Sequence, residues 1–313
     1  MEMDFNEILS KINKELRIPL LPEIPTYEIR TKLNEYIKEM ETADNKASSL
    51  NPEYNFYCGM NFYYTDNYET SLECFNKAIE LKPDYYNAFY NKAILLRTLE
   101  REEEAIEACS KAIEINSNDP KIWYTKGTIF AKLLDYEKAI ECFEKAFELK
   151  PDYYDAIYNK ATVLSKLGNF EESVKTCDKA IELNPNDAKI WYNRANSLAD
   201  NGLLKEAIKS YDKAIEINPN FVLAFYNKAI VLGVMGLYNK SLETYDIVIE
   251  LRPELAMAWY NKACMYAWKS DKENSLKHLA KAIDLDTKNK EKAKADEDFL
   301  NLWNDEDFIK LTT

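Results

Sequence analysis

Tyrosine and asparagine side chains recur in this sequence at one fixed interval, and their chemistry suits the binding of a polypeptide. The tyrosines are Tyr90, Tyr124, Tyr158, Tyr192, Tyr226 and Tyr260, and the asparagines that follow them are Asn91, Asn159, Asn193, Asn227 and Asn261. A tyrosine offers a rigid ring with one hydroxyl, and an asparagine amide can both donate and accept a hydrogen bond. We therefore expect a ladder that grips a peptide backbone, or alternatively a set of residues that stabilises helix stacking.

Basic residues on the same expected face would give that ladder a preference for charge. They are Lys121, Lys189, Arg97, Lys132 and Lys166, and the acids on that face are Glu53, Asp155 and Asp200. The face is slightly positive in a chain whose formal net charge is −13. Because complementary charge steers association, the predicted partner is a protein or peptide with acidic groups, such as a C-terminal carboxylate.

The overall composition argues against several other ligands. A nucleic-acid backbone and an anionic membrane both call for a basic surface, so neither is expected as a partner of this acidic chain. No run of about 18 apolar residues and no apolar signal core occurs, so we expect the cytoplasm. The six cysteines form no CxxC pair and His278 is the single histidine. We therefore predict neither a metal site nor a cofactor. Without a phosphate loop or a nucleophile beside a base, an enzyme is not expected.

An uninterrupted repeat of constant length organises most of the chain. Aligned on the motif KAIEL, the predicted units are 52–85, 86–119, 120–153, 154–187, 188–221, 222–255 and 256–289. Within each unit, position 8 is small (Gly or Ala), whereas positions 4 and 11 are mostly large. At 100° per residue these three positions share one side of a first helix. Position 20 is small and position 24 is mostly apolar in a second helix, and Gly at position 15 or Pro at position 32 separates the helices.

This pattern resembles the tetratricopeptide repeat family, whose units are about 34 residues long, and the resemblance covers residues 52–289. It implies an all-α fold, a right-handed superhelical solenoid of seven helix-turn-helix units whose first helices line a groove. It implies a protein–protein interaction scaffold rather than one particular function. Some family members hold a C-terminal carboxylate with a lysine at position 5, which is Tyr or Phe here, so that clamp is absent. Position 7, usually apolar in the family, is basic in six units, and the sequence does not identify the acidic partners of these residues.

Repeats 6 and 7 carry a different groove chemistry from the others. Their expected groove positions hold apolar residues, namely Leu223, Ile230, Val234, Met257, Cys264 and Trp268. The sequence therefore predicts that the ladder ends in an apolar surface.

The two ends of the chain complete the predicted organisation. Residues 290–313 are expected to cap the last repeat, because an open repeat exposes its apolar flank. Residues 1–51 form an N-terminal extension, in which helices with apolar stripes flank the proline-rich segment 18–25. Residues 27–45 are expected to pack against the first repeat. Residues 1–25 could then cap the array, occupy its groove or bridge two molecules, and a self-assembling structural protein, a homo-oligomer through residues 1–25, is the alternative function.

Overall fold

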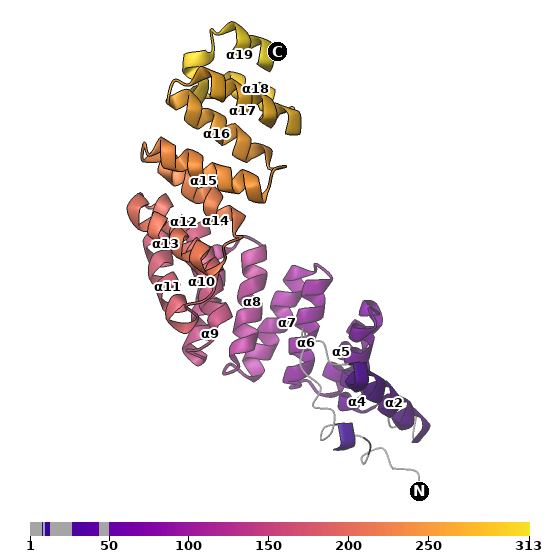
Figure 1. Cartoon of the computed structure of the whole chain (residues 1–313). Coiled ribbons are helices and arrows are strands. Elements are labelled where there is room, and N and C mark those ends of the chain that lie inside the picture. The colour runs from indigo at the N-terminus through magenta and orange to yellow at the C-terminus, as the bar shows by residue number, and fades with distance from the viewer. Residues whose placement is uncertain (1–7, 9, 13–26, 44–49) are drawn as a thin grey trace. The chain divides into compact units, whose positions relative to one another are not determined.

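The computed structural model describes residues 8, 10–12, 27–43 and 50–313, and all regular structure in these residues is helical. Seven consecutive helix pairs fill residues 52–285 (Figure 1). The pairs are α4 (Pro52–Tyr64) with α5 (Tyr68–Leu81), α6 (Tyr86–Thr98) with α7 (Glu102–Ile115), α8 (Pro120–Lys132) with α9 (Tyr136–Leu149), α10 (Tyr154–Lys166) with α11 (Phe170–Leu183), α12 (Ala188–Asp200) with α13 (Leu204–Ile217), α14 (Val222–Val234) with α15 (Tyr238–Leu251), and α16 (Ala256–Trp268) with α17 (Lys272–Leu285). The predicted all-helical tetratricopeptide-type architecture is therefore confirmed.

The chain divides into two compact units, Met1–Val163 and Leu164–Thr313, and the boundary falls inside α10. In each unit, successive helices along the chain pack on one another, so every helix contacts mainly its neighbours in sequence. None of the helices among the described residues is long and apolar enough to cross a membrane.

Capping side chains explain where three of the first helices, α4, α8 and α12, begin. The carboxylates of Asp119 and Asp187 accept hydrogen bonds from the backbone N–H groups of Lys121 and Lys189, at 2.9 and 2.8 Å. Such caps satisfy N–H groups that have no partner within the helix. Pro120 occupies the first turn of α8, where its missing N–H has no cost.

The contact between the two helices of a pair depends on the small residue at position 8. A Cβ atom on Gly127 would lie 2.8 Å from Cε1 of Phe143, the position-24 residue of the same pair. In other pairs the small position-20 residue adds a hydrogen bond, as where Ser71 donates to the Gly59 carbonyl at 2.7 Å. The predicted alternation of small and large residues therefore brings the backbones close. The sequence prediction missed position 3, which is fully buried in six repeats: Ala88, Ile122, Ala156, Ile190, Ala224 and Ala258.

The turn within each pair places position 15 in the left-handed region of the backbone. Glycine meets this need at Gly168 (φ +85°), but Leu134 adopts the same conformation with φ +63°. A left-handed residue other than glycine costs roughly 1–2 kcal/mol, partly offset by the entropy that glycine loses on folding.

We therefore expect Leu134→Gly to raise the free energy of unfolding by about 1 kcal/mol. The reverse change, Gly168→Leu, should lower it by a similar amount, because nothing lies within 4 Å of a Cβ atom there and only backbone strain is added. Urea denaturation followed by circular dichroism measures both. Equal effects of the same sign would contradict the role assigned to position 15.

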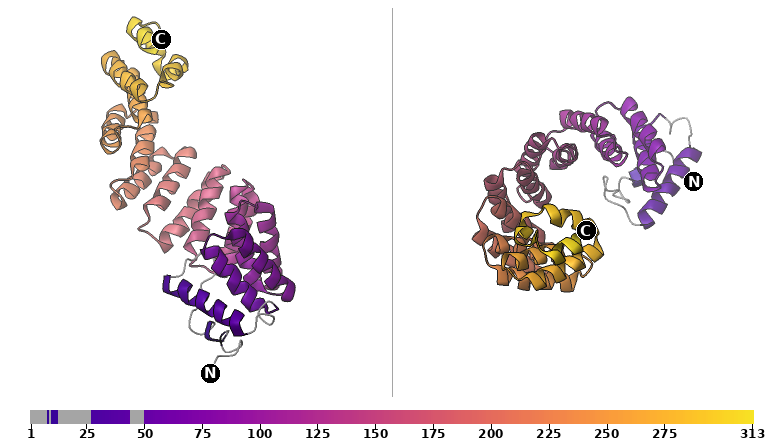
Figure 2. Two further views of the ribbon diagram at one scale, coloured as in Figure 1. Left: turned by 90° about the vertical axis from the view of Figure 1, so that its right-hand side faces the viewer. Right: turned by 90° about the horizontal axis from the view of Figure 1, so that it is seen from above.

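Additional helices cover both ends of the array (Figure 2). Helix α2 (Tyr27–Ala43) packs against α4 and buries Leu33 and Met40 completely. At the other end, α18 (Asn289–Ala295), η2 (Glu297–Leu302) and α19 (Glu306–Thr312) pack on α16 and α17. The predictions for residues 1–25 lie outside the described residues, except that Ile8 and Ile12 are buried.

Candidate functional site

The tyrosine column at position 5 packs inside the helix array. The ring of Tyr124 lies 5.8 Å from Phe143 and 5.1 Å from Tyr153, measured between centroids. Tyr192 makes equivalent contacts with the rings of Tyr211 and Phe221, at 6.1 and 5.0 Å. Burial raises the pKa of Tyr124, because the phenolate would lose its hydration. These rings therefore contribute to the core between helices, and Tyr90 and Tyr260 are almost completely buried.

The asparagine column joins each repeat to the one before it. The Nδ2 amide of Asn159 donates to the hydroxyl of Tyr124 at 3.0 Å. The same bond forms from Asn227 to Tyr192 and from Asn261 to Tyr226, at 2.9 Å in both cases. In the third repeat the asparagine is replaced by a threonine, and Thr125 hydrogen-bonds to Tyr90 instead. In the other repeats, Tyr158 and Asn193 are half-buried and Asn91 is buried. These contacts favour the second sequence hypothesis, in which the two columns stabilise helix stacking.

Because a neutral hydrogen bond contributes about 1 kcal/mol net, the Tyr124–Asn159 link has a measurable energy. We expect Tyr124→Phe and Asn159→Ala to lower the free energy of unfolding, with a coupling of about 1 kcal/mol in the double mutant. Chemical denaturation of the wild type, the two single variants and the double variant gives this coupling. Strictly additive effects would mean that the bond contributes nothing to stacking.

Five of the six basic residues at position 7 find their partners at position 25 of the preceding repeat. Lys160 pairs with Glu144 at 2.7 Å and Arg194 with Asp178 at 2.7 Å. Lys228 pairs with Asp212 at 2.6 Å, and Lys262 pairs with Asp246. Lys126 instead donates to the hydroxyl of Ser110 at 3.0 Å. The stems are packed and the charged ends meet a carboxylate or hydroxyl, so this column is a second link between repeats.

Four of the five basic residues predicted for the groove are exposed, and two of the five, Lys132 and Arg97, contact neighbouring helices. Lys132 forms ion pairs with Glu102 at 2.5 Å and Glu100 at 3.6 Å. Arg97 donates to the hydroxyl of Thr128 at 3.0 Å. The side chains of Lys121, Lys166 and Lys189 are exposed. The ammonium group of Lys132 is therefore paired with carboxylates of the protein itself.

The side of the first helices that holds positions 2, 9 and 13 is hereafter the groove face. Positions 2 and 13 are exposed or half-buried, whereas position 9 is exposed only at Ile230. The polarity of the groove face changes in the second unit, where α14 and α16 expose large apolar side chains. The exposed fractions are 53% for Leu223, 68% for Val234, 50% for Met257 and 52% for Trp268. The predicted apolar surface is therefore present, except that Cys264 is buried. Large exposed apolar groups close together commonly mark an interaction site.

Two adjoining cavities open on this part of the groove face and share Ile230. The first has a volume of about 210 Å³ and is lined by Ile230, Gly233, Val234, Tyr245, Asn261, Cys264, Met265, Trp268 and Asp298. The second has a volume of about 420 Å³ and is lined by Ser165, Asn196, Ala199, Asp200, Tyr211, Asn227, Ile230 and Val231. The first is mainly apolar, whereas the second offers amides, hydroxyls and a carboxylate.

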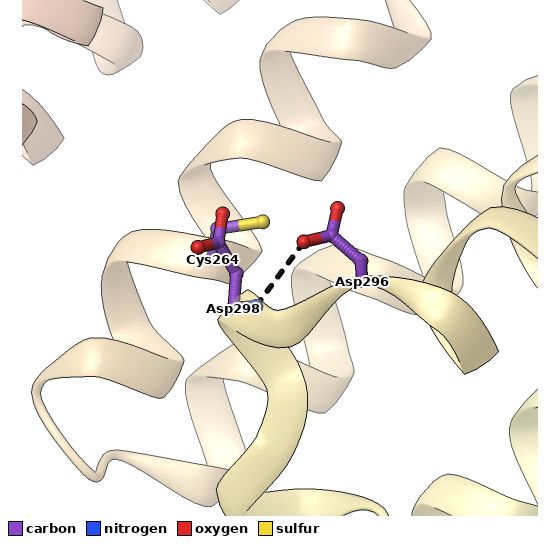
Figure 3. Close-up of side chains that lie close together, drawn as sticks. All are labelled: Cys264, Asp296 and Asp298. Atoms are coloured by element: carbon purple, nitrogen blue, oxygen red, sulfur yellow. Dashed lines mark hydrogen bonds between the residues drawn. The ribbon is translucent and has the colours of Figure 1, made fainter.

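Beside the first cavity, Cys264 meets two carboxylates of the cap (Figure 3). Ligand atoms of Cys264, Asp296 and Asp298 lie within 4.8 Å of one another, a spacing that a metal ion could bridge. However, Asp296 accepts a hydrogen bond from Tyr260 at 2.7 Å, and Asp298 accepts one from Nε1 of Trp268 at 2.9 Å. Burial and the nearby carboxylates raise the pKa of the Cys264 thiol, because both disfavour the thiolate. The three residues are best explained as the attachment of the cap to α16.

Models of the tetratricopeptide repeat match most of the chain. They match residues 59–85, 86–119, 120–153, 154–187, 188–221, 210–243 and 256–289. An uncharacterized protein of Methanocaldococcus jannaschii is 49% identical over 53 residues, which are 17% of this chain and 62% of that protein. The chain thus aligns with less than two thirds of that relative.

Solved structures share the same helix-pair architecture. The structure of YrrB, described as a TPR protein with an unusual peptide-binding site, is 30% identical, with a TM-score of 0.54 over 61% of this chain and 98% of YrrB. A repeat-containing protein of Cytophaga hutchinsonii is 20% identical, with a TM-score of 0.66 over 75% of this chain and 97% of that one. A protein of Parabacteroides merdae is 17% identical, with a TM-score of 0.58 over 83% and 98% of the two chains. The last two share the fold alone.

Proposed function

The chain belongs to the tetratricopeptide repeat family and has the architecture of a protein–protein interaction scaffold, and on this premise we propose that it binds a peptide or protein segment along the groove face. The observation that carries the proposal is the group of apolar side chains that α14 and α16 expose to solvent. Burying such side chains against a partner gains about 25 cal/mol per Å² of apolar surface. The peptide-binding site named for YrrB, the 30% identical protein, is consistent with this function.

The proposal places the variable contacts outside the tyrosine and asparagine columns. Since Tyr124, Tyr192 and Tyr226 bond to asparagines of the next repeat, they support the face rather than provide its selectivity. Positions 2, 9 and 13 differ between repeats, and these are the residues that a bound segment would contact.

A selection experiment on the full-length chain tests the proposal. A phage-displayed library of random peptides is selected on the wild-type protein, and synthetic copies of the enriched peptides are titrated by calorimetry. Each enriched peptide should bind at least tenfold more weakly to one of two variants. These are Lys121→Glu in the first compact unit and Val234→Glu in the second. The control Lys179→Glu changes a residue of α11 that is not on the groove face and should leave affinity unchanged. Enriched peptides that are indifferent to every groove-face variant would refute groove binding.

The acidic partner predicted from the lysines remains a proposal for the part of the groove face around Lys121. If it is correct, Lys121→Glu should weaken peptides with acidic side chains or a free C-terminal carboxylate more than neutral ones. The loss should shrink as salt concentration rises, because screening weakens exposed charge pairs.

The alternative function, self-assembly through residues 1–25, also remains a prediction. Substituting Leu20→Asp and Leu21→Asp places charges in the apolar segment and should convert an oligomer to a monomer if the segment bridges molecules. Static light scattering at several protein concentrations measures the mass directly. A wild-type chain that is already monomeric excludes this alternative at those concentrations.

A further inference from the structure

The groove face of the second unit combines a mainly apolar cavity with acidic lining residues. At position 2 the two preceding repeats carry Asp155 and Lys189, whereas α14 and α16 carry Leu223 and Met257. At position 13, α10 and α12 carry Lys166 and Asp200, whereas α14 and α16 carry Val234 and Trp268. Both positions therefore change from charged to apolar in the last two repeats, at both ends of α14 and α16.

Close packing of Met265 on a glycine shapes one wall of the first cavity. Gly233 lies in its wall, and a Cβ atom there would lie 2.6 Å from Sδ of Met265. The ring of Trp268 forms another wall, with its edge held by the Nε1 bond to Asp298. A volume of about 210 Å³ is suited to one large aliphatic or aromatic side chain rather than to a whole small molecule.

The two charged residues that line these cavities are both acidic. Asp298 lines the first cavity, Asp200 lines the second, and no lysine or arginine of the described residues lines either one. Asp298 accepts hydrogen bonds from the indole N–H of Trp268 and from the Cys264 thiol. Both donors are neutral, so no base is paired with this carboxylate among the described residues. Lys292, a nearby base, lies over the Tyr260 ring at 3.9 Å from its centroid. A cation from outside would therefore meet favourable potential here.

We propose that this surface, formed by α14, α16 and η2, binds a partner segment that presents a large apolar side chain close to a lysine or arginine. The apolar side chain enters the cavity between Gly233 and Trp268, and the cation pairs with Asp298. The inference rests on the proposed groove function and adds the chemistry of the partner. It also assigns to this surface a basic segment, unlike the acidic one expected at Lys121.

Two substitutions separate the apolar and the cationic contacts. Asp298→Asn keeps an oxygen that can accept the Trp268 bond but removes the charge, so peptides with Lys or Arg should bind about tenfold more weakly. Replacing that Lys or Arg of the peptide by citrulline should abolish the effect of the substitution. The adjacent exposed carboxylate provides the matched control Glu297→Gln, which should leave affinity unchanged. Gly233→Ala should displace the flexible end of Met265 into the cavity and weaken peptides through their apolar residue, with little effect on folding.

The experiment uses the random-peptide library and the full-length chain. The inference is supported if enriched peptides that are sensitive to Val234→Glu pair an apolar residue with Lys or Arg and lose affinity with Asp298→Asn. It is overturned if such peptides carry acidic residues instead, or if Asp298→Asn and Glu297→Gln behave alike. It is also overturned if Val234→Glu abolishes self-association seen by light scattering, because the occupant is then a second copy. Groove binding through Lys121 alone would refute this inference while leaving the proposed function intact, whereas insensitivity to both Val234→Glu and Lys121→Glu would refute both.

Discussion

Phe299→Ala should lower the free energy of unfolding of the C-terminal end by about 3–5 kcal/mol. Phe299 is completely buried, and its ring contacts Tyr260 of α16 and Phe308 of α19 at 5.6 and 5.7 Å between centroids. Because each repeat contacts mainly its neighbours, the loss should be concentrated in the last repeat rather than shared by the whole chain. Removing the ring leaves a cavity at the place where the cap closes the apolar flank of α16 and α17.

Hydrogen exchange measured by mass spectrometry locates this effect. The amides of α16, α17 and α19 should exchange faster in Phe299→Ala, while those of α6 to α9 keep their wild-type rates. The adjacent residue provides a matched control, since Leu300 is 62% exposed and Leu300→Ala should change little. Uniformly faster exchange along the chain would mean that the array unfolds as one cooperative unit.

Gly127→Leu should have the second-largest effect, a loss of about 2–3 kcal/mol of unfolding free energy. The new Cβ would lie 2.8 Å from the Phe143 ring and 3.2 Å from Cβ of Cys142, so α8 and α9 must move apart. The better helix propensity of leucine offsets only about 1 kcal/mol of the strain.

A double-mutant cycle distinguishes this clash from other effects of the substitution. Phe143→Ala destabilises the pair by itself, but it opens space beside position 8. The double variant Gly127→Leu/Phe143→Ala should therefore be more stable than the sum of the two single losses predicts. Additive losses in urea denaturation would show that position 8 does not meet position 24 as described.

The fold could be predicted because the residues that mark the turns and the residues that mark the packed helix faces indicate the same repeat. Small residues at position 8 and large ones at position 24 mark the two faces that meet within a pair, and Gly168 marks the turn between its helices. These signals are repeated without insertion, so one register satisfies every unit. Position 3 was missed because in four of the six repeats it is an alanine, as at Ala156 and Ala224, which carries little hydrophobic signal although it is completely buried.

The site was harder to predict, because residues from different repeats form its contacts. A tyrosine and an asparagine side by side look like two free hydrogen-bonding groups, yet the hydroxyl of Tyr192 meets the amide of Asn227, 35 residues later. A signal was present in the sequence, because the acids Asp178 and Asp212 precede their basic partners Arg194 and Lys228 by one constant interval. That interval far exceeds the three or four residues that separate neighbours on a helix, so only the stacking of repeats reveals its meaning.

The links between repeats have a consequence for how such a chain can change its length in evolution. Loss of residues 222–255, one whole repeat, would place Asp212 opposite Lys262 and Tyr192 opposite Asn261, so acid would still meet base and hydroxyl would still meet amide. Gene duplication or deletion in steps of one repeat thus creates junctions that already match. The same deletion would remove Gly233 and Val234 and with them the apolar cavity. A change of one repeat would therefore keep the links between repeats but not the apolar cavity.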